Sequence, residues 1–158
     1  MEIDFQSLWN IVSAPFAGQA WSIHGPDHWR RVERNGLRLA TRTHANLKVV
    51  RLFALFHDSR RVNDGWDPDH GARGAEFAAS FRGKAFQLAD DEFDLLHYAC
   101  VWHTAGTRHE HSTIATCWDA DRLDLGRVGI IPDPKRMCTG FGRELAAAGS
   151  VESFLNQT

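Results

Sequence analysis

Several histidines and aspartates of this chain occupy positions where a helix would face the interior of the protein. Asp121 is the most informative, because it lies on the apolar stripe that Ile114, Cys117, Trp118 and Leu125 form at helical spacing. Burying a carboxylate without a partner is costly, so this side chain should either be paired or bind a metal ion. A salt bridge, or a hydrogen bond to nearby backbone, is the alternative reading of Asp121 taken alone.

Two histidines repeat this pattern on other predicted helices. His103 shares a helix face with Leu96 and Cys100, and His70 shares one with Phe77. A single histidine on an apolar face is more often a hydrogen-bonded core residue than a ligand. Several helices that each direct one ligand-type side chain inward are typical of metal sites in helical bundles. We therefore expect these residues to converge.

The dipeptide His57-Asp58 follows the apolar run VVRLFALF at the end of a predicted buried helix. Adjacent helical residues point about 100° apart, so both can reach one ion only near a helix end. We expect both to act in catalysis as well as in metal binding. His28 opens an earlier helix and is a further candidate ligand. His24, just before that helix, should have a structural or neutral role.

Mixed histidine and carboxylate donors suit Mn, Fe, Ni, Co or Zn. Such an ion lowers the pKa of a bound water and polarises a phosphoryl oxygen. An anionic substrate would also need cationic donors, and guanidinium groups fit phosphate well. Arg60 and Arg61 directly follow the His-Asp pair, and Arg31 covers the same side of its helix as His28. These three are candidate phosphate ligands, although a solvated charge run at a helix end would explain Arg60 and Arg61 equally well.

Helical periodicity dominates the whole chain, and no repeat, linker or hairpin signal interrupts it. The pattern predicts helices over residues 5–12, 26–43, 46–60, 68–82, 91–103, 112–125 and 142–155. Asp67-Pro68 should begin the fourth helix and Asp90 should cap the fifth, while 126–134 should form a loop. The prediction is one all-α domain over residues 1–158.

The net charge, the cysteines and the distribution of apolar residues indicate which kinds of partner the protein can have. The chain has 158 residues, a net charge of −2 and three cysteines without CxxC spacing. That charge argues against a surface for duplex nucleic acid but allows a local cationic pocket. The opening residues are acidic and interrupted by polar side chains, unlike a signal peptide, and no apolar run approaches a membrane span. We expect a cytoplasmic protein with reduced thiols and no membrane contact.

Three segments together resemble the HD superfamily of metal-dependent phosphohydrolases, and in particular its small stand-alone bacterial members. They are HGPDHWRRV, LFALFHDSRR and CWDADRLDLG, within a core of about residues 24–127. The resemblance implies an all-α fold with five or more core helices. It also implies a metal held by the following four residues: His28, His57, Asp58 and Asp121. The family's last ligand occurs in an Ala-Asp dipeptide, which selects Asp121, with Asp119 as the alternative.

Some HD subgroups bind two metal ions, and His70 and His103 resemble their additional ligands. These two histidines would either complete a second metal site, with Asp58 bridging, or bind the phosphate. The resemblance implies hydrolysis of a small phosphate ester or nucleotide through a metal-activated water. Two alternatives stay open at this point: an HD-type di-iron oxygenase with the same ligands, and a non-catalytic protein that senses a nucleotide or a metal.

Overall fold

The chain folds as an all-α protein, as the sequence predicts. The computed structural model describes residues 2–18 and 21–149, which form seven α-helices and two short 3-10 helices and contain no strand. The elements, in chain order, are α1 (Phe5–Ser13), α2 (Pro26–Thr43), α3 (Leu47–Phe56), α4 (His70–Phe81), α5 (Asp90–Trp102), α6 (Ser112–Arg122), η1 (Leu123–Val128), η2 (Pro134–Arg136) and α7 (Gly140–Ala148). None of the helices in these ranges is long and apolar enough to cross a membrane.

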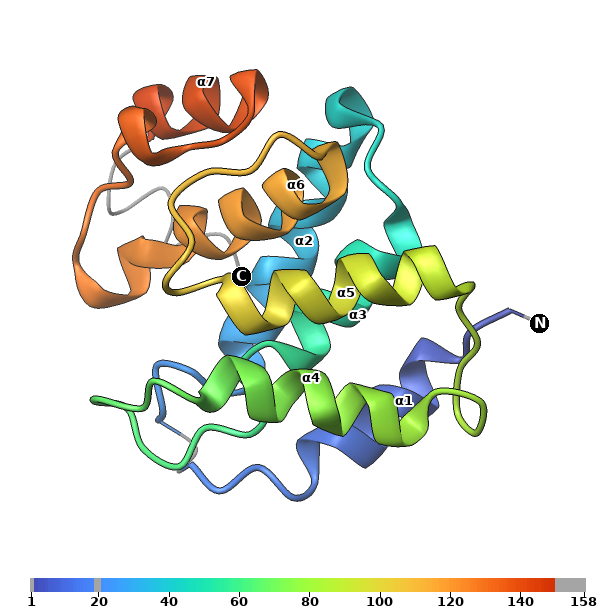
Figure 1. The fold of residues 1–158 in the computed structure, drawn as a ribbon. Helices are drawn as coiled ribbons and strands as arrows, with labels where there is room; N and C mark the ends of the chain where they lie inside the picture. The colour runs from blue at the N-terminus through green and yellow to red at the C-terminus, as the bar shows by residue number, and fades with distance from the viewer. Residues whose placement is uncertain (1, 19–20, 150–158) are drawn as a thin grey trace.

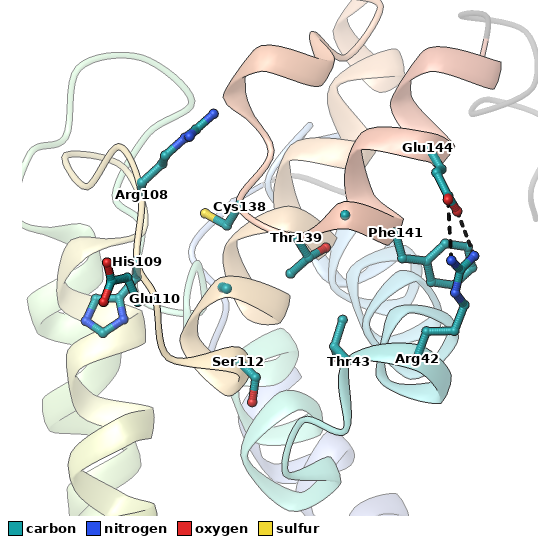
Figure 2. A pocket seen from close by; sticks show the side chains of 12 residues that line it. Arg42, Thr43, Arg108, His109, Glu110, Ser112, Cys138, Thr139, Phe141 and Glu144 are labelled. Carbon is teal, nitrogen blue, oxygen red and sulfur yellow. Dashed lines mark hydrogen bonds and ion pairs between the residues drawn. The ribbon is translucent and has the colours of Figure 1, made fainter.

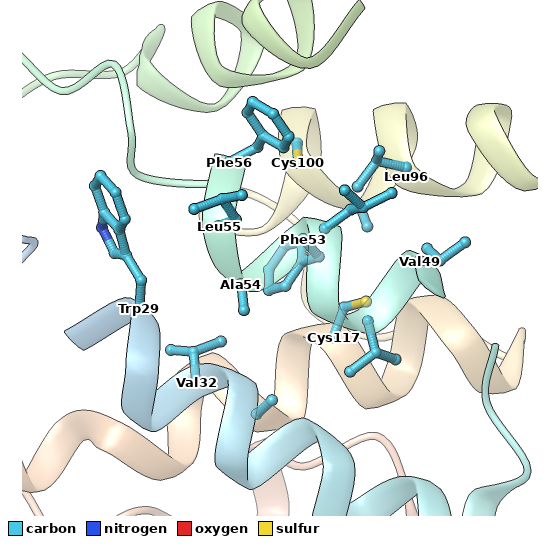
Figure 3. Packing of buried hydrophobic residues seen from close by; sticks show 14 of the residues in the cluster. Trp29, Val32, Val49, Phe53, Ala54, Leu55, Phe56, Leu96, Cys100 and Cys117 are labelled. Carbon is cyan, nitrogen blue, oxygen red and sulfur yellow. The ribbon is translucent and has the colours of Figure 1, made fainter. Parts of the chain in front are cut away.

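Helix α3 lies at the centre of the molecule, where α2, α5 and α6 surround it (Figure 1). Phe53 of α3 is fully buried, and side chains such as Val32 of α2, Leu96 of α5 and Cys117 of α6 pack around the helix (Figure 3). The apolar run therefore forms a central buried helix, as predicted. Cys117 and Cys100 belong to this core as free thiols.

Helix α4 covers one side of the core and approaches the backbone of its neighbours closely (Figure 1). A Cβ atom at Gly74 would collide with the carbonyl oxygen of Phe56, and one at Gly71 would collide with that of Cys100. The two glycines thus allow the first turns of α4 to lie directly against the ends of α3 and α5. This close contact fixes where the first residue of α4, His70, can lie.

Several helix boundaries differ from the predicted ones. Helix α3 ends at Phe56 rather than at residue 60, and α6 ends at Arg122, after which the chain tightens into η1. Asp67 does not cap α4, because its carboxylate accepts hydrogen bonds from Arg73 and from a loop amide. The cap of α5 is residue 89 rather than 90. The last helix is α7, which ends at residue 148, and residues 150–155 of the predicted one lie outside the described residues.

Candidate metal centre

Five helix ends meet at one buried place and bring the candidate ligands together there. The ligands come from the first turns of α2 and α4 and from the C-terminal ends of α3, α5 and α6. They are the following six residues: His28, His57, Asp58, His70, His103 and Asp121. Helix ends suit this purpose, because a side chain there can turn inward without crossing its own helix.

A tight turn sets the His-Asp pair at the end of α3. His57 keeps a helical backbone conformation as the C-cap, and the amides of Ser59 and Arg61 then bond to the carbonyls of Phe56 and Asp58 at 3.2 Å each. The chain therefore curls back directly after the helix. Both His57 and Asp58 remain buried, so the pair does lie at a helix end inside the protein, as the sequence predicts.

One half of the centre surrounds the Oδ2 atom of Asp58. His28 Nε2 lies 3.4 Å from this oxygen and His57 Nε2 lies 3.5 Å from it. The two imidazole Nε2 atoms are 3.2 Å apart. Asp121 Oδ1 closes the group, 3.1 Å from His28 Nε2 and 3.5 Å from His57 Nε2. Ligands of one transition-metal ion at bond lengths of about 2.0–2.2 Å stand about 3 Å apart, so these separations fit.

The other half of the centre surrounds the Oδ1 atom of Asp58. His70 Nε2 lies 3.2 Å from this oxygen and His103 Nε2 lies 3.4 Å from it. The two Nε2 atoms are 2.9 Å apart. One carboxylate therefore faces two pairs of histidines, one pair with each of its oxygens. The arrangement gives two overlapping donor sets that share Asp58.

Hydrogen bonds on the outer nitrogen fix the orientation of each imidazole. His57 Nδ1 faces the carbonyls of Phe53 and Ala54, at 3.0 and 3.1 Å. His103 Nδ1 faces the carbonyl oxygen of Cys100 at 2.7 Å. His70 Nδ1 faces the carbonyl oxygen of Asp67. A carbonyl only accepts, so each Nδ1 carries the hydrogen, and in the neutral ring Nε2 presents a lone pair.

Inward lone pairs and carboxylates repel one another unless a cation stands between them. Two imidazole Nε2 pairs and two carboxylates meet here in a buried space, which is the donor set of a divalent transition-metal site. The residues present therefore fit a bound metal ion.

The pKa values of the buried histidine and aspartates in the centre also indicate that this site favours a bound cation. Burial alone lowers the pKa of His28, but hydrogen bonds with nearby carboxylates outweigh it and raise the pKa to about 10. Burial raises the pKa of Asp58 and of Asp121, yet the surrounding histidines hold both well below their usual range. The carboxylates thus stay ionised and hold a proton on His28 when no other cation neutralises them.

Asp119, the alternative to Asp121, faces away from the centre. Its carboxylate accepts hydrogen bonds from the amides of Cys138 and Thr139 at 2.7 and 2.8 Å, and from the Thr139 hydroxyl at 2.7 Å. Asp119 therefore fixes the start of α7, and it is Asp121 that lies against His28.

The three candidate arginines occupy different places. Arg61 Nε lies 3.5 Å from Asp58 Oδ1, and this buried nitrogen has no hydrogen-bond partner among the described residues. Arg60 lies over the ring of Phe77, outside the centre. Arg31 Nε bonds to Asp124 Oδ1 at 2.8 Å. Of the three, Arg61 is the one whose guanidinium lies beside the donor cluster, and the phosphate-binding role of all three remains a prediction.

Two residues near the centre are additions to the predicted set. His24 Nδ1 lies 3.1 Å from Asp58 Oδ2, whereas the sequence indicated a structural or neutral residue. Asp124 Oδ2 lies 2.7 Å from His28 Nδ1 and is buried. Its position three residues after Asp121 is the one sequence signal for Asp124, since that spacing returns to the same side of a helix. Nothing in the sequence distinguishes His24 from a solvent-facing histidine.

Comparison with known proteins gives one informative match. No family model matches this chain, and no curated protein does. A solved structure described as a predicted HD superfamily hydrolase from an uncultured Thermotogales bacterium is similar, with a TM-score of 0.73 and 26% sequence identity. The similarity covers 95% of this chain and 86% of that one, so it extends across most of the fold.

Proposed function

We propose that this chain, which is similar in structure to a predicted HD superfamily hydrolase and has a histidine and aspartate cluster that fits an HD-type metal site, is a metal-dependent phosphohydrolase that acts on a small phosphate ester or nucleotide. The observation that carries the proposal is the pair of buried donor sets that share Asp58. The solved relative is itself named only as a predicted hydrolase, and the reaction proposed here rests on the chemistry of the donors.

Two metal ions fit these donors better than one. Each oxygen of Asp58 has its own pair of histidines, and the two pairs come from different helices. His28, His57, Asp58 and Asp121 would hold one ion, and Asp58, His70 and His103 would hold the other. Divalent ions in such a site lower the pKa of a water and neutralise charge on a phosphoryl oxygen.

The chain's own polar groups complete the site. Arg61 is almost buried, and its unpartnered Nε–H beside Asp58 supports a role in holding a phosphate oxygen. His24 is the more exposed partner of Asp58, with 13% of its side chain accessible. Its position between Asp58 and the solvent supports a role in moving a proton to or from the site. Asp58 itself holds His24 by this contact.

A metal-by-substrate panel tests the proposal. The purified protein is loaded in turn with Mn²⁺, Co²⁺ and Ni²⁺ and assayed on phosphomonoesters, phosphodiesters and nucleotides. We expect release of phosphate or nucleoside phosphate with at least one metal, and no release by Asp58→Ala at equal protein concentration. Two results would contradict the proposal: no turnover on any member of the panel, or iron-dependent consumption of O₂ without phosphatase activity, which is the outcome expected of an oxygenase.

A further inference from the structure

A basic cavity of about 610 Å³ lies between the segment after α5 and the segment around η2. Four of the residues that line it are cationic and none is acidic: Arg108, Arg122, Lys135 and Arg136. The rest of the wall is the loop 104–107, made of small and hydroxyl side chains. A concentration of positive charge is unexpected in a chain whose net charge is −2.

Those four cations also lack ion pairs. Within residues 2–18 and 21–149, no carboxylate forms a salt bridge with any of them, whereas many arginines elsewhere are paired, such as Arg31, Arg51 and Arg73. Two nearby aspartates instead accept hydrogen bonds from backbone amides. Asp133 binds the amide of Lys135, and Asp119 binds the amides at the start of α7. None of the four cations is therefore directly paired with a carboxylate in the described residues, although Asp119 lies close enough to feel the charge of Arg122.

Two of the arginines hold the walls in place. Arg122 donates from Nη2 to Gly106 O at 2.6 Å and from Nη1 to Arg136 O at 2.9 Å. Arg108 donates to Lys135 O at 3.1 Å. These bonds join the loop after α5 to the η2 segment through neutral carbonyls, so the guanidinium charges remain. The side chains of Lys135 and Arg136 make no hydrogen bond in the part of the chain that is described.

A neighbouring cavity has both acidic and basic side chains in its wall, unlike the basic cavity. It has about 680 Å³, shares Arg108 and is drawn in Figure 2. There Glu144 forms an ion pair with Arg42 at 2.6 Å, and Glu110 adds a second carboxylate to the wall. That cavity is electrostatically mixed and gives no indication of a charged ligand. The cavity at η2 differs in that its wall carries four cations and no carboxylate.

Thr104 links the basic cavity to the metal centre by its contacts. This residue lines the cavity, and its hydroxyl oxygen lies 3.4 Å from His70 Nε2. His103, the preceding residue, belongs to the same half of the centre. Thr104 therefore belongs both to the wall of the basic cavity and to the surroundings of the His70 half of the centre.

We propose that the basic cavity binds a second phosphate group of the substrate, so that the preferred substrates carry two or more phosphates. The inference rests on the proposed function for the site of reaction, but binding in the cavity does not require turnover. Arginine and lysine side chains bind phosphate oxygens through charge-assisted hydrogen bonds, which makes a polyphosphate or bisphosphate the matching class. A substrate with a single phosphate would leave these cations unused.

Binding of imidodiphosphate tests the inference, because this probe has two phosphate groups and its P–N linkage resists hydrolysis. Isothermal titration calorimetry compares three metal-loaded proteins: the wild type, Lys135→Ala/Arg136→Ala, and Arg38→Ala/Lys84→Ala as the matched control. Both double variants remove one lysine and one arginine, and Arg38 and Lys84 are exposed away from the cavity. We expect the cavity variant to bind about 10-fold more weakly or worse. The control should stay within about twofold, because exposed charges in salt solution act only over short distances.

The inference fails if the wild type does not bind imidodiphosphate, or if both double variants bind it as the wild type does. Its failure is distinct from that of the proposed function. If the protein hydrolyses phosphate esters but the cavity variant binds imidodiphosphate as the wild type does, the proposed role of the cavity is wrong and the proposed phosphohydrolase function stands. If only the cavity variant binds imidodiphosphate more weakly and no substrate is hydrolysed, the cavity is a phosphate-binding site and the proposed phosphohydrolase function is wrong. Equal thermal unfolding midpoints for the three proteins would confirm that folding is not the cause.

Discussion

His28 Nδ1 and Asp124 Oδ2 lie 2.7 Å apart, with both side chains buried. The other oxygen of Asp124 accepts a hydrogen bond from Arg31 Nε at 2.8 Å. This chain of contacts fixes the orientation of the His28 ring, so that its Nε2 atom faces Asp58 and Asp121. A carboxylate behind a ligand histidine also increases the basicity of the ring. Arg31 thus contacts the centre through Asp124 rather than directly.

Asp124→Asn should weaken metal binding at the His28 half of the centre by about 10- to 100-fold, because the charge behind the imidazole is lost while its shape is kept. Titration of metal-depleted protein with Co²⁺ or Mn²⁺ would measure the affinity. Asp91→Asn, an exposed residue in the first turn of α5, is the control and should bind as the wild type does. Equal affinities in the two variants would show that Asp124 has no part in orienting His28.

His103→Ala should reduce the bound metal from two ions to one per chain. The change removes one of the two histidines beside Asp58 Oδ1 and leaves the His28 half intact. Metal analysis after loading and dialysis gives the stoichiometry. His97→Ala is the matched control, since His97 lies on α5, has 41% of its side chain accessible, and contacts Glu76 and Phe93 rather than the centre. An unchanged stoichiometry in His103→Ala would argue for a single ion.

Arg61→Ala should raise KM for a phosphate ester by about 10-fold with the metal content unchanged. A charge-assisted hydrogen bond to substrate phosphate is worth about 1.5–3 kcal/mol, which corresponds to about 10- to 150-fold, so a 10-fold rise lies at the lower end. Arg60→Ala provides an internal comparison, because Arg60 lies over Phe77 and should have little effect on KM. Steady-state kinetics on both variants would separate the two residues. If Arg60→Ala raised KM as much as Arg61→Ala, a general effect of surface charge would explain the result.

Asp119→Ala should destabilise the fold without removing a metal ligand. The substitution leaves the amides of Cys138 and Thr139 without their acceptor in a largely buried setting, at a cost of about 2–4 kcal/mol. Urea denaturation would measure the loss. The fraction that remains folded should bind metal with the stoichiometry of the wild type. Loss of one ion together with retained stability would instead identify Asp119 as a ligand.

Periodicity and composition were enough to predict the all-α fold, the central buried helix and the inward position of Asp121. These properties depend on local patterns of apolar residues, which the sequence displays directly. The end of α3 was predicted about four residues too late, because the turn after Phe56 depends on side chains that arrive from other helices. His57 and Asp58 converge only through that turn.

The supporting contacts could not be predicted in the same way. Asp124 meets His28 across 96 positions of the chain, and His24 meets Asp58 across 34. Contacts of this kind depend on how helices pack, and no local spacing encodes them. The basic cavity is a similar case, because its cations come from three separate segments that are joined by the bonds of Arg122 to backbone carbonyls.

Metal analysis of the purified wild type beside Asp58→Ala tests the central claim most directly. Asp58 is the one side chain shared by both donor sets, so its loss should affect both ions at once. After loading with Mn²⁺ or Co²⁺ and exhaustive dialysis, we expect about two ions per chain in the wild type and close to none in Asp58→Ala, with the helical circular dichroism of both proteins alike. A wild type that retains no transition metal, or an Asp58→Ala protein that retains as much as the wild type, would contradict the assignment of this cluster as a metal centre.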